Sequence, residues 1–222
     1  MPLTFSNFYK LNQLSSINLG GNFSTTWNGQ YHKTASGTEP NPGSGLTSGS
    51  LRMLDASLLP QEIQALMQRK GLIYIFISTS YHLLYVGISR GNLKSGVFGP
   101  GRFSHHARKL LAALGGGTDH TGGWTEPAVD RYGRYRDFVL ARQPGGVSEE
   151  ETASHLWGDW RFAFASCDSP DKHEGWVLDS MDSQLCEFWA DVTILNTGQV
   201  KRVPIDHELP PNLHAVVRQA VE

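Results

Sequence analysis

The chain has 222 residues, of which 39% are hydrophobic and 18% are charged, and its formal net charge at pH 7 is -2. This length fits one large domain or a domain with an appendage, and the near-neutral charge excludes a generic nucleic-acid coat, which needs many Lys and Arg contacts to phosphate. No apolar run approaches the ~20 residues that cross a bilayer, and the N-terminus lacks a secretion signal, so we expect a soluble, cytoplasmic protein without a membrane partner.

The first 56 residues are rich in Ser, Gly, Asn and Thr, and the stretch 38–50 has no periodicity. This composition predicts an N-terminal arm or linker. Aromatic residues at 5–9 and 27–31 indicate that the arm packs onto the main domain. The pattern then changes at residues 57–70, where apolar residues recur at helical spacing, with Ser57 as the expected N-cap and Gly71 as the stop.

Two runs rich in β-branched and aromatic residues follow, at 72–78 and 82–89, and their short separation predicts a β-hairpin. Further along, the patterns predict a helix at 102–114, a strand at 137–141, an acidic helix at 148–156, a strand at 160–166 and a helix at 173–190. We therefore predict an α+β fold: a small, mainly antiparallel three-stranded sheet flanked by helices. The main domain spans 57–200 with an insertion at 114–158, and a tail follows at 201–222.

Charge is unevenly distributed along the chain. Residues 90–142 hold nine basic and four acidic residues, whereas residues 143–199 hold two basic and eleven acidic residues. A basic face beside an acidic, metal-attracting face would explain this pattern, and two solvated faces are the simpler reading. Cys167 and Cys186 form no CxxC pair, so we expect both to be reduced and buried.

Chemistry-bearing residues gather around the predicted hairpin. The sequence reads Gly-Leu-Ile-Tyr at 71–74 and Tyr-Val-Gly at 85–87, and the next predicted helix carries Arg102 and His106 one turn apart, on the same face. In this combination the chain resembles the GIY-YIG nuclease family, which has its two named motifs on such a hairpin and an Arg and a His on its first helix.

The resemblance implies a glutamate on a later helix as metal ligand, followed by an asparagine. Glu187 and Asn196 stand at those places. The interval between them is tighter than the family pattern, so Glu174 and Glu151 are alternative ligands. The implied cofactor is Mg²⁺, or Mn²⁺ in its place, and Gly87 and Asn196 are implied to be structural.

These residue types suit phosphodiester hydrolysis, which needs an activated water and a counter-charge for the phosphate. Arg102 would supply a charged donor fork, and Glu187 would hold one divalent cation. Tyr74 would orient or deprotonate the water, with His106 beside it and Tyr85 completing the polar cluster. Because a free tyrosine titrates near about 10, that role requires neighbouring positive charge, and the identity of the base stays open.

Other residues are candidate contacts to nucleic acid. Arginines interleaved with aromatic residues in the insertion can bind phosphate and stack on bases, and basic residues lie close to the hairpin. The candidates are Arg90, Lys94, His105, Arg134 and Arg136. A solvated loop or helix surface is the simpler interpretation of each.

The resemblance thus implies a metal-dependent endonuclease that cuts DNA, with a restriction or defence enzyme as the favoured setting. Its specificity would come from the insertion, the N-terminal arm or formation of a homodimer. Two alternatives stay open: a catalytically inactive nucleic-acid-binding module, and a protein-interaction domain whose acidic half docks a basic partner.

Overall fold

A computed structural model describes residues 3–17, 31–34, 37–40, 51–93, 141, 159–196 and 210–222. The chain divides into two compact units: residues 1–14, 53–97 and 157–222 form the first, and residues 15–52 and 98–156 form the second. The described strands outside the main sheet form two small sheets. In one, β3 (Tyr31–Thr34) pairs antiparallel with β4 (Gly37–Pro40). In the other, β2 (Ser15–Ile17) pairs with β5 (Leu51–Met53).

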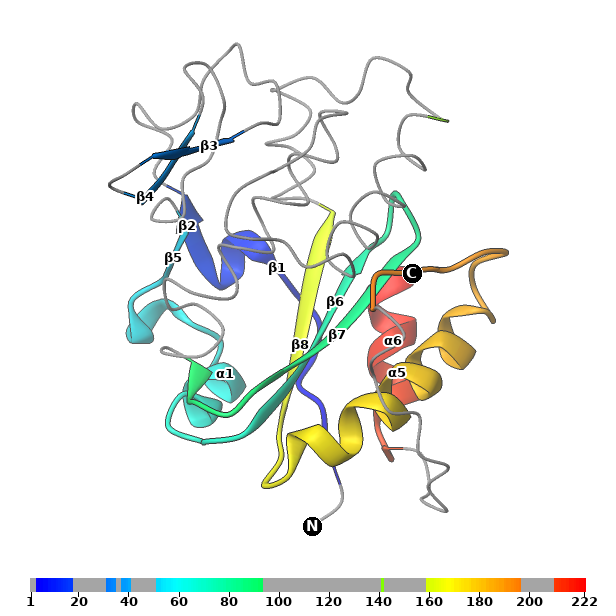
Figure 1. The fold of residues 1–222 in the computed structure, drawn as a ribbon. Helices are drawn as coiled ribbons and strands as arrows, with labels where there is room; N and C mark the ends of the chain where they lie inside the picture. The colour runs from blue at the N-terminus through cyan, green and yellow to red at the C-terminus, as the bar shows by residue number, and fades with distance from the viewer. Residues whose placement is uncertain are drawn as a thin grey trace. The chain divides into compact units, whose positions relative to one another are not determined.

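The first unit is built on a five-stranded sheet with the order β1-β8-β6-β7-β9 (Figure 1). Its strands are β1 (Tyr9–Lys10), β6 (Leu72–Ser78), β7 (Leu83–Ser89), β8 (Trp160–Ser166) and β9 (Thr193–Ile194). β6 pairs antiparallel with both β7 and β8, β1 pairs antiparallel with β8, and β9 runs parallel to β7. The predicted α+β class is confirmed, but the sheet is mixed and has five strands where three were expected.

The central strands follow directly from their sequences. β6 is a run of β-branched, aromatic and apolar residues, and all seven of its residues are buried. Such a run suits a strand that is covered on both faces. The turn between β6 and β7 is fixed by the carboxylate of Asp159, which accepts hydrogen bonds from the Ser78 and Thr79 hydroxyls and from the Ser80 amide, the last at 2.6 Å.

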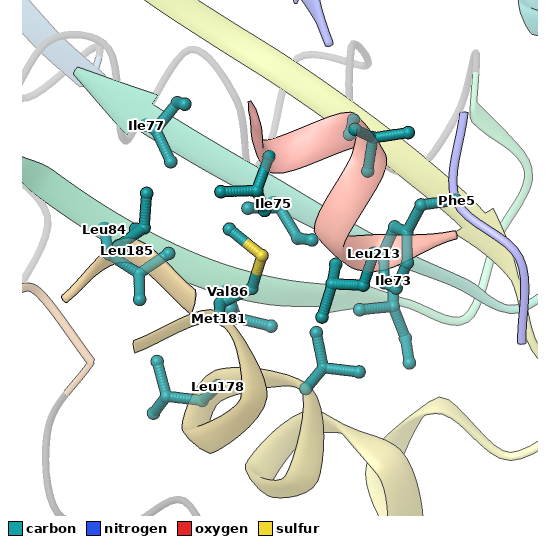
Figure 2. Close-up of a cluster of buried hydrophobic side chains, with 14 of the residues drawn as sticks. Phe5, Ile73, Ile75, Ile77, Leu84, Val86, Leu178, Met181, Leu185 and Leu213 are labelled. Carbon is teal, nitrogen blue, oxygen red and sulfur yellow. The ribbon is translucent and has the colours of Figure 1, made fainter. Parts of the chain in front are cut away.

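One face of the sheet packs against two helices, α5 (Pro170–Leu185) and α6 (Leu213–Val221). Figure 2 shows side chains of both helices meeting the isoleucines of β6 and Val86 of β7. Every second residue of β6 contributes to this core, as the alternation of side chains along a strand requires. The labelled core residues in that view are Phe5, Ile73, Ile75, Ile77, Leu84, Val86, Leu178, Met181, Leu185 and Leu213.

The two ends of the chain belong to this core. Phe5 is 3% exposed, and its amide and carbonyl groups exchange hydrogen bonds with the Asn212 side chain at 3.1 and 2.6 Å. Ser6 makes two hydrogen bonds with Phe164 of β8: its amide donates to the Phe164 carbonyl, and its hydroxyl accepts from the Phe164 amide. The start of the predicted arm and the end of the predicted tail are therefore parts of the first unit.

The helices depart from prediction at their ends. α1 (Gln61–Leu66) begins after Pro60, and a short 3-10 helix, η2 (Ala56–Leu58), precedes it. Ser57 is not the N-cap: its amide donates to Asp55, which caps η2. A second 3-10 helix, η1 (Leu11–Gln13), follows β1. α5 begins three residues before the predicted start at 173, because Pro170 suits a first helical turn, and it ends at Leu185 before the predicted end at 190.

The remaining predictions concern the two cysteines, the strand at 137–141, two helices and membrane-spanning segments. Both cysteines are free as expected, but Cys186 is exposed, because it caps the end of α5. Ala141 is helical, not extended as predicted for 137–141, in keeping with the high helix propensity of alanine. The helices predicted at 102–114 and 148–156 lie outside the described residues. Within the described ranges, no helix has the length and apolarity that crossing a membrane requires.

Candidate functional site

Tyr74 and Tyr85 lie on the same face of the sheet. Tyr85 is paired with Phe76 on β6, so it shares a face with Phe76 and Tyr74, whereas Ile73 and Ile75 point to the opposite face. The ring centroids of the two tyrosines are 6.0 Å apart, with a tilt of 51° between the ring planes. The structure therefore brings together the two phenols that the sequence singled out.

Gly87 makes this arrangement possible. It is the register partner of Tyr74, and a Cβ placed on it would overlap the Tyr74 ring, with only 2.7 Å to the ring carbon Cε2. The phenol ring therefore lies across the backbone of β7 where a side chain would otherwise stand. A glycine after Tyr-Val is thus a packing requirement of this hairpin.

The tyrosine face is aromatic and largely covered. Phe76 stacks on Phe162 with ring centroids 5.0 Å apart, and the edge of Trp160 meets Phe76 at 5.1 Å. Tyr74 is 2% exposed, whereas Tyr85 is only half-buried. Of the two phenols, Tyr85 is the one that solvent reaches.

Asn196 holds the strand that carries Tyr85. Its side-chain oxygen accepts from the Val86 amide at 2.9 Å, and its side-chain nitrogen donates to the Val86 carbonyl at 2.7 Å. The amide group therefore takes the place of a neighbouring strand at the residue between Tyr85 and Gly87. This contact, between positions 110 residues apart, gives Asn196 a structural role.

Glu187 lies with the helices, on the other side of the sheet from the tyrosine rings. It follows the end of α5, and its carboxylate is 3.5 Å from Nε2 of His214 on α6. Both side chains are about half exposed, at 53% and 56%. The neighbouring Phe188 and Trp189 pack in the core between α5, α6 and the sheet. The described contacts thus join Glu187 to His214 and do not bring it to the tyrosines.

The first turn of α5 lies at the end of the sheet that is nearer to Tyr74. A Cβ on Gly71, just before β6, would be 3.7 Å from Pro170, and Asp171 pairs with Arg90, just after β7. Glu174, in this part of α5, is half-buried and makes contacts of its own. By position along the strands, Glu174 therefore lies nearer to Tyr74 than Glu187 does, but α5 packs on the opposite face of the sheet from the tyrosine rings.

The remaining predicted site residues lie outside the described residues. They are Arg102 and His106 of the expected catalytic set, Glu151 among the alternative ligands, and Lys94, His105, Arg134 and Arg136 among the expected nucleic-acid contacts. Arg90 is described, with a side chain that is 81% exposed.

Two polar groups near the hairpin turn were not predicted from the sequence. One is Asp159, which is 6% exposed and organises the turn. The other is His82, whose backbone φ is 48° and whose ring stacks on Trp189 with centroids 4.8 Å apart, while Asp191 lies 3.5 Å from its Nδ1. The Ser-Thr-Ser sequence of the turn supplies the hydroxyl donors, but their partner Asp159 is 79 to 81 positions away, so no local pattern identifies it.

A Cys–His contact elsewhere in this unit does not form a nucleophile. Nδ1 of His173 is 2.9 Å from the Ser169 carbonyl and 3.3 Å from the sulfur of Cys167. A nitrogen that faces a carbonyl carries the proton, so it cannot accept one from the thiol. Burial also raises the pKa of Cys167, which keeps the thiol protonated.

The metal implied by the resemblance finds no shared site in the described geometry. Within the described ranges, no three His, Cys, Asp or Glu side chains come together. Glu187, the expected ligand, faces His214 and lies across the sheet from both phenols. Of the carboxylate and the two phenols that the resemblance would gather around one cation, the described contacts bring together the phenols.

Comparison of the chain with protein-family models, with curated proteins and with solved structures gives no match.

Proposed function

We propose that the chain is a GIY-YIG-like endonuclease that hydrolyses phosphodiester bonds in DNA. The observation that carries this proposal is the hairpin itself: Tyr74 packed on Gly87, with Tyr85 beside it on the same face. The three antiparallel strands β7, β6 and β8, followed by α5, give this hairpin the α+β setting that the resemblance implies.

The two phenols would have different tasks. Tyr85 is half-buried, so its hydroxyl can meet a substrate phosphate or the attacking water. Tyr74 is almost fully buried and its ring is fixed over Gly87, so it would position Tyr85 and the backbone of β7. Arg102 and His106 would complete the site with a guanidinium for the phosphate and an imidazole for proton transfer.

The catalytic carboxylate would be Glu187, with Glu174 on α5 as an alternative, and α5 packs on the face of the sheet opposite the tyrosine rings. Glu174 belongs to the part of α5 that lies near Tyr74, while Glu187 is paired with His214. Glu151 is the third candidate. The resemblance also implies that cleavage depends on Mg²⁺ or Mn²⁺, and loss of activity on chelation would support that dependence.

A second candidate function has an observation of its own. Tyr74 is 2% exposed, and the face around it is covered by aromatic and aliphatic side chains. A module that kept the hairpin as part of its core and binds nucleic acid without cutting it would have the same face. The third reading, a protein-interaction domain, predicts no binding of nucleic acid at low salt.

Cleavage of supercoiled plasmid with Mg²⁺ tests the proposal. We expect Tyr85→Phe to slow cleavage by about 100-fold, within the range of a lost proton-transfer or orienting group, and Tyr74→Phe to slow it less. Tyr9→Phe is the matched control, because it removes a phenol from β1, two strands away from β6 in the sheet. We expect one of the variants Glu187→Gln, Glu174→Gln and Glu151→Gln to abolish cleavage and the other two to leave it near the wild-type rate.

Three results would count against the proposal. A wild-type chain that retards plasmid on a gel but never nicks it favours the inactive binding module. Equal rates for wild type, Tyr85→Phe and Tyr9→Phe remove the role of Tyr85. Near-wild-type cleavage by all three glutamate variants, with intact folding by circular dichroism, removes the carboxylate role.

A further inference from the structure

We draw no further inference here: the strongest candidate, the indole Nε1 of Trp160 on the tyrosine face of the five-stranded sheet, is a buried donor without a hydrogen-bond partner among the described residues, and nothing in these residues shows which group would face it.

Discussion

At the scale of single residues, the hairpin depends on one missing side chain. The Tyr74 ring occupies the space where a Cβ of residue 87 would stand. The clash is with an aromatic ring that is 2% exposed and has little room to move. Steric overlap in a packed interior typically costs 1–3 kcal/mol, so we expect Gly87→Ala to lower the free energy of unfolding by about 2 kcal/mol, measured by urea denaturation.

The same substitution gives a test of the cause. In a Tyr74→Leu background the ring is absent, so Gly87→Ala should cost much less than it does alone, with a coupling energy of about 1 kcal/mol between the two sites. Additive effects of the two changes would contradict the explanation. The Tyr-Val-Gly sequence could be recognised in advance, but the reason for its glycine could not, because that reason is a ring on another strand.

At the scale of elements, β7 is held from outside by one amide side chain. Val86 has β6 on one side, and Asn196 supplies both hydrogen-bonding partners that β9 is too short to supply on the other. Asn196→Ala would leave an amide and a carbonyl of β7 without these partners, and an unsatisfied buried polar group costs about 1–3 kcal/mol. We expect a loss of about 2 kcal/mol and faster hydrogen exchange of the Val86 amide.

Asn196→Asp is the informative control for this prediction. An ionised aspartate keeps the acceptor for the Val86 amide and loses the donor to the Val86 carbonyl. The Val86 amide should therefore stay protected in Asn196→Asp while the protein is still destabilised. Unchanged stability in Asn196→Ala would show that water replaces the amide without cost.

The elements that the sequence predicted best are those with strong local patterns. Strands β6 and β8 have the predicted bounds, because each is a seven-residue run in which aromatic residues alternate with isoleucines in β6 and chiefly with alanines in β8. The two-residue strands β1 and β9 carry no such pattern, since their backbone pairs with a neighbour whatever their side chains are. The helix α6 was assigned to a tail although its apolar residues recur at helical spacing.

The candidate site was predictable in part for a related reason. Tyr74, Tyr85 and Gly87 belong to one hairpin, so their proximity follows from local pairing. The place of Glu187 depends on how α5 and α6 pack, and its contact with His214 is invisible in the sequence. Residues joined by distant packing are therefore the ones that sequence reasoning could not bring together.

At the scale of the whole molecule, the N-terminal segment is linked to α1 by the half-buried phenol of Tyr9. The Tyr9 hydroxyl donates to Glu62, which also accepts from the Asn7 amide at 2.9 Å. Burial, followed by the hydrogen bond to Glu62 and its negative charge, raises the pKa of Tyr9 from 10.0 to about 12. The folded protein therefore keeps the Tyr9 proton more strongly than the unfolded chain does.

This shift fixes the sign of a pH effect. The stability that Tyr9 contributes is fully present below pH 10 and is lost as pH rises toward about 12. The difference in unfolding free energy between wild type and Tyr9→Phe should accordingly be constant at neutral pH and shrink between these limits. A difference that grows in that interval would show that the ionised form is the one stabilised.

The two hydrogen bonds between Phe5 and Asn212 have a consequence for biosynthesis. Their partners are 207 positions apart, and the C-terminal helix that follows Asn212 packs in the same core as Phe5. On the ribosome, the segment that contains Phe5 is synthesised long before the segment that contains Asn212. The first unit can thus reach its final form only after residues 212–221 have been synthesised, and until then Phe5 lacks these partners.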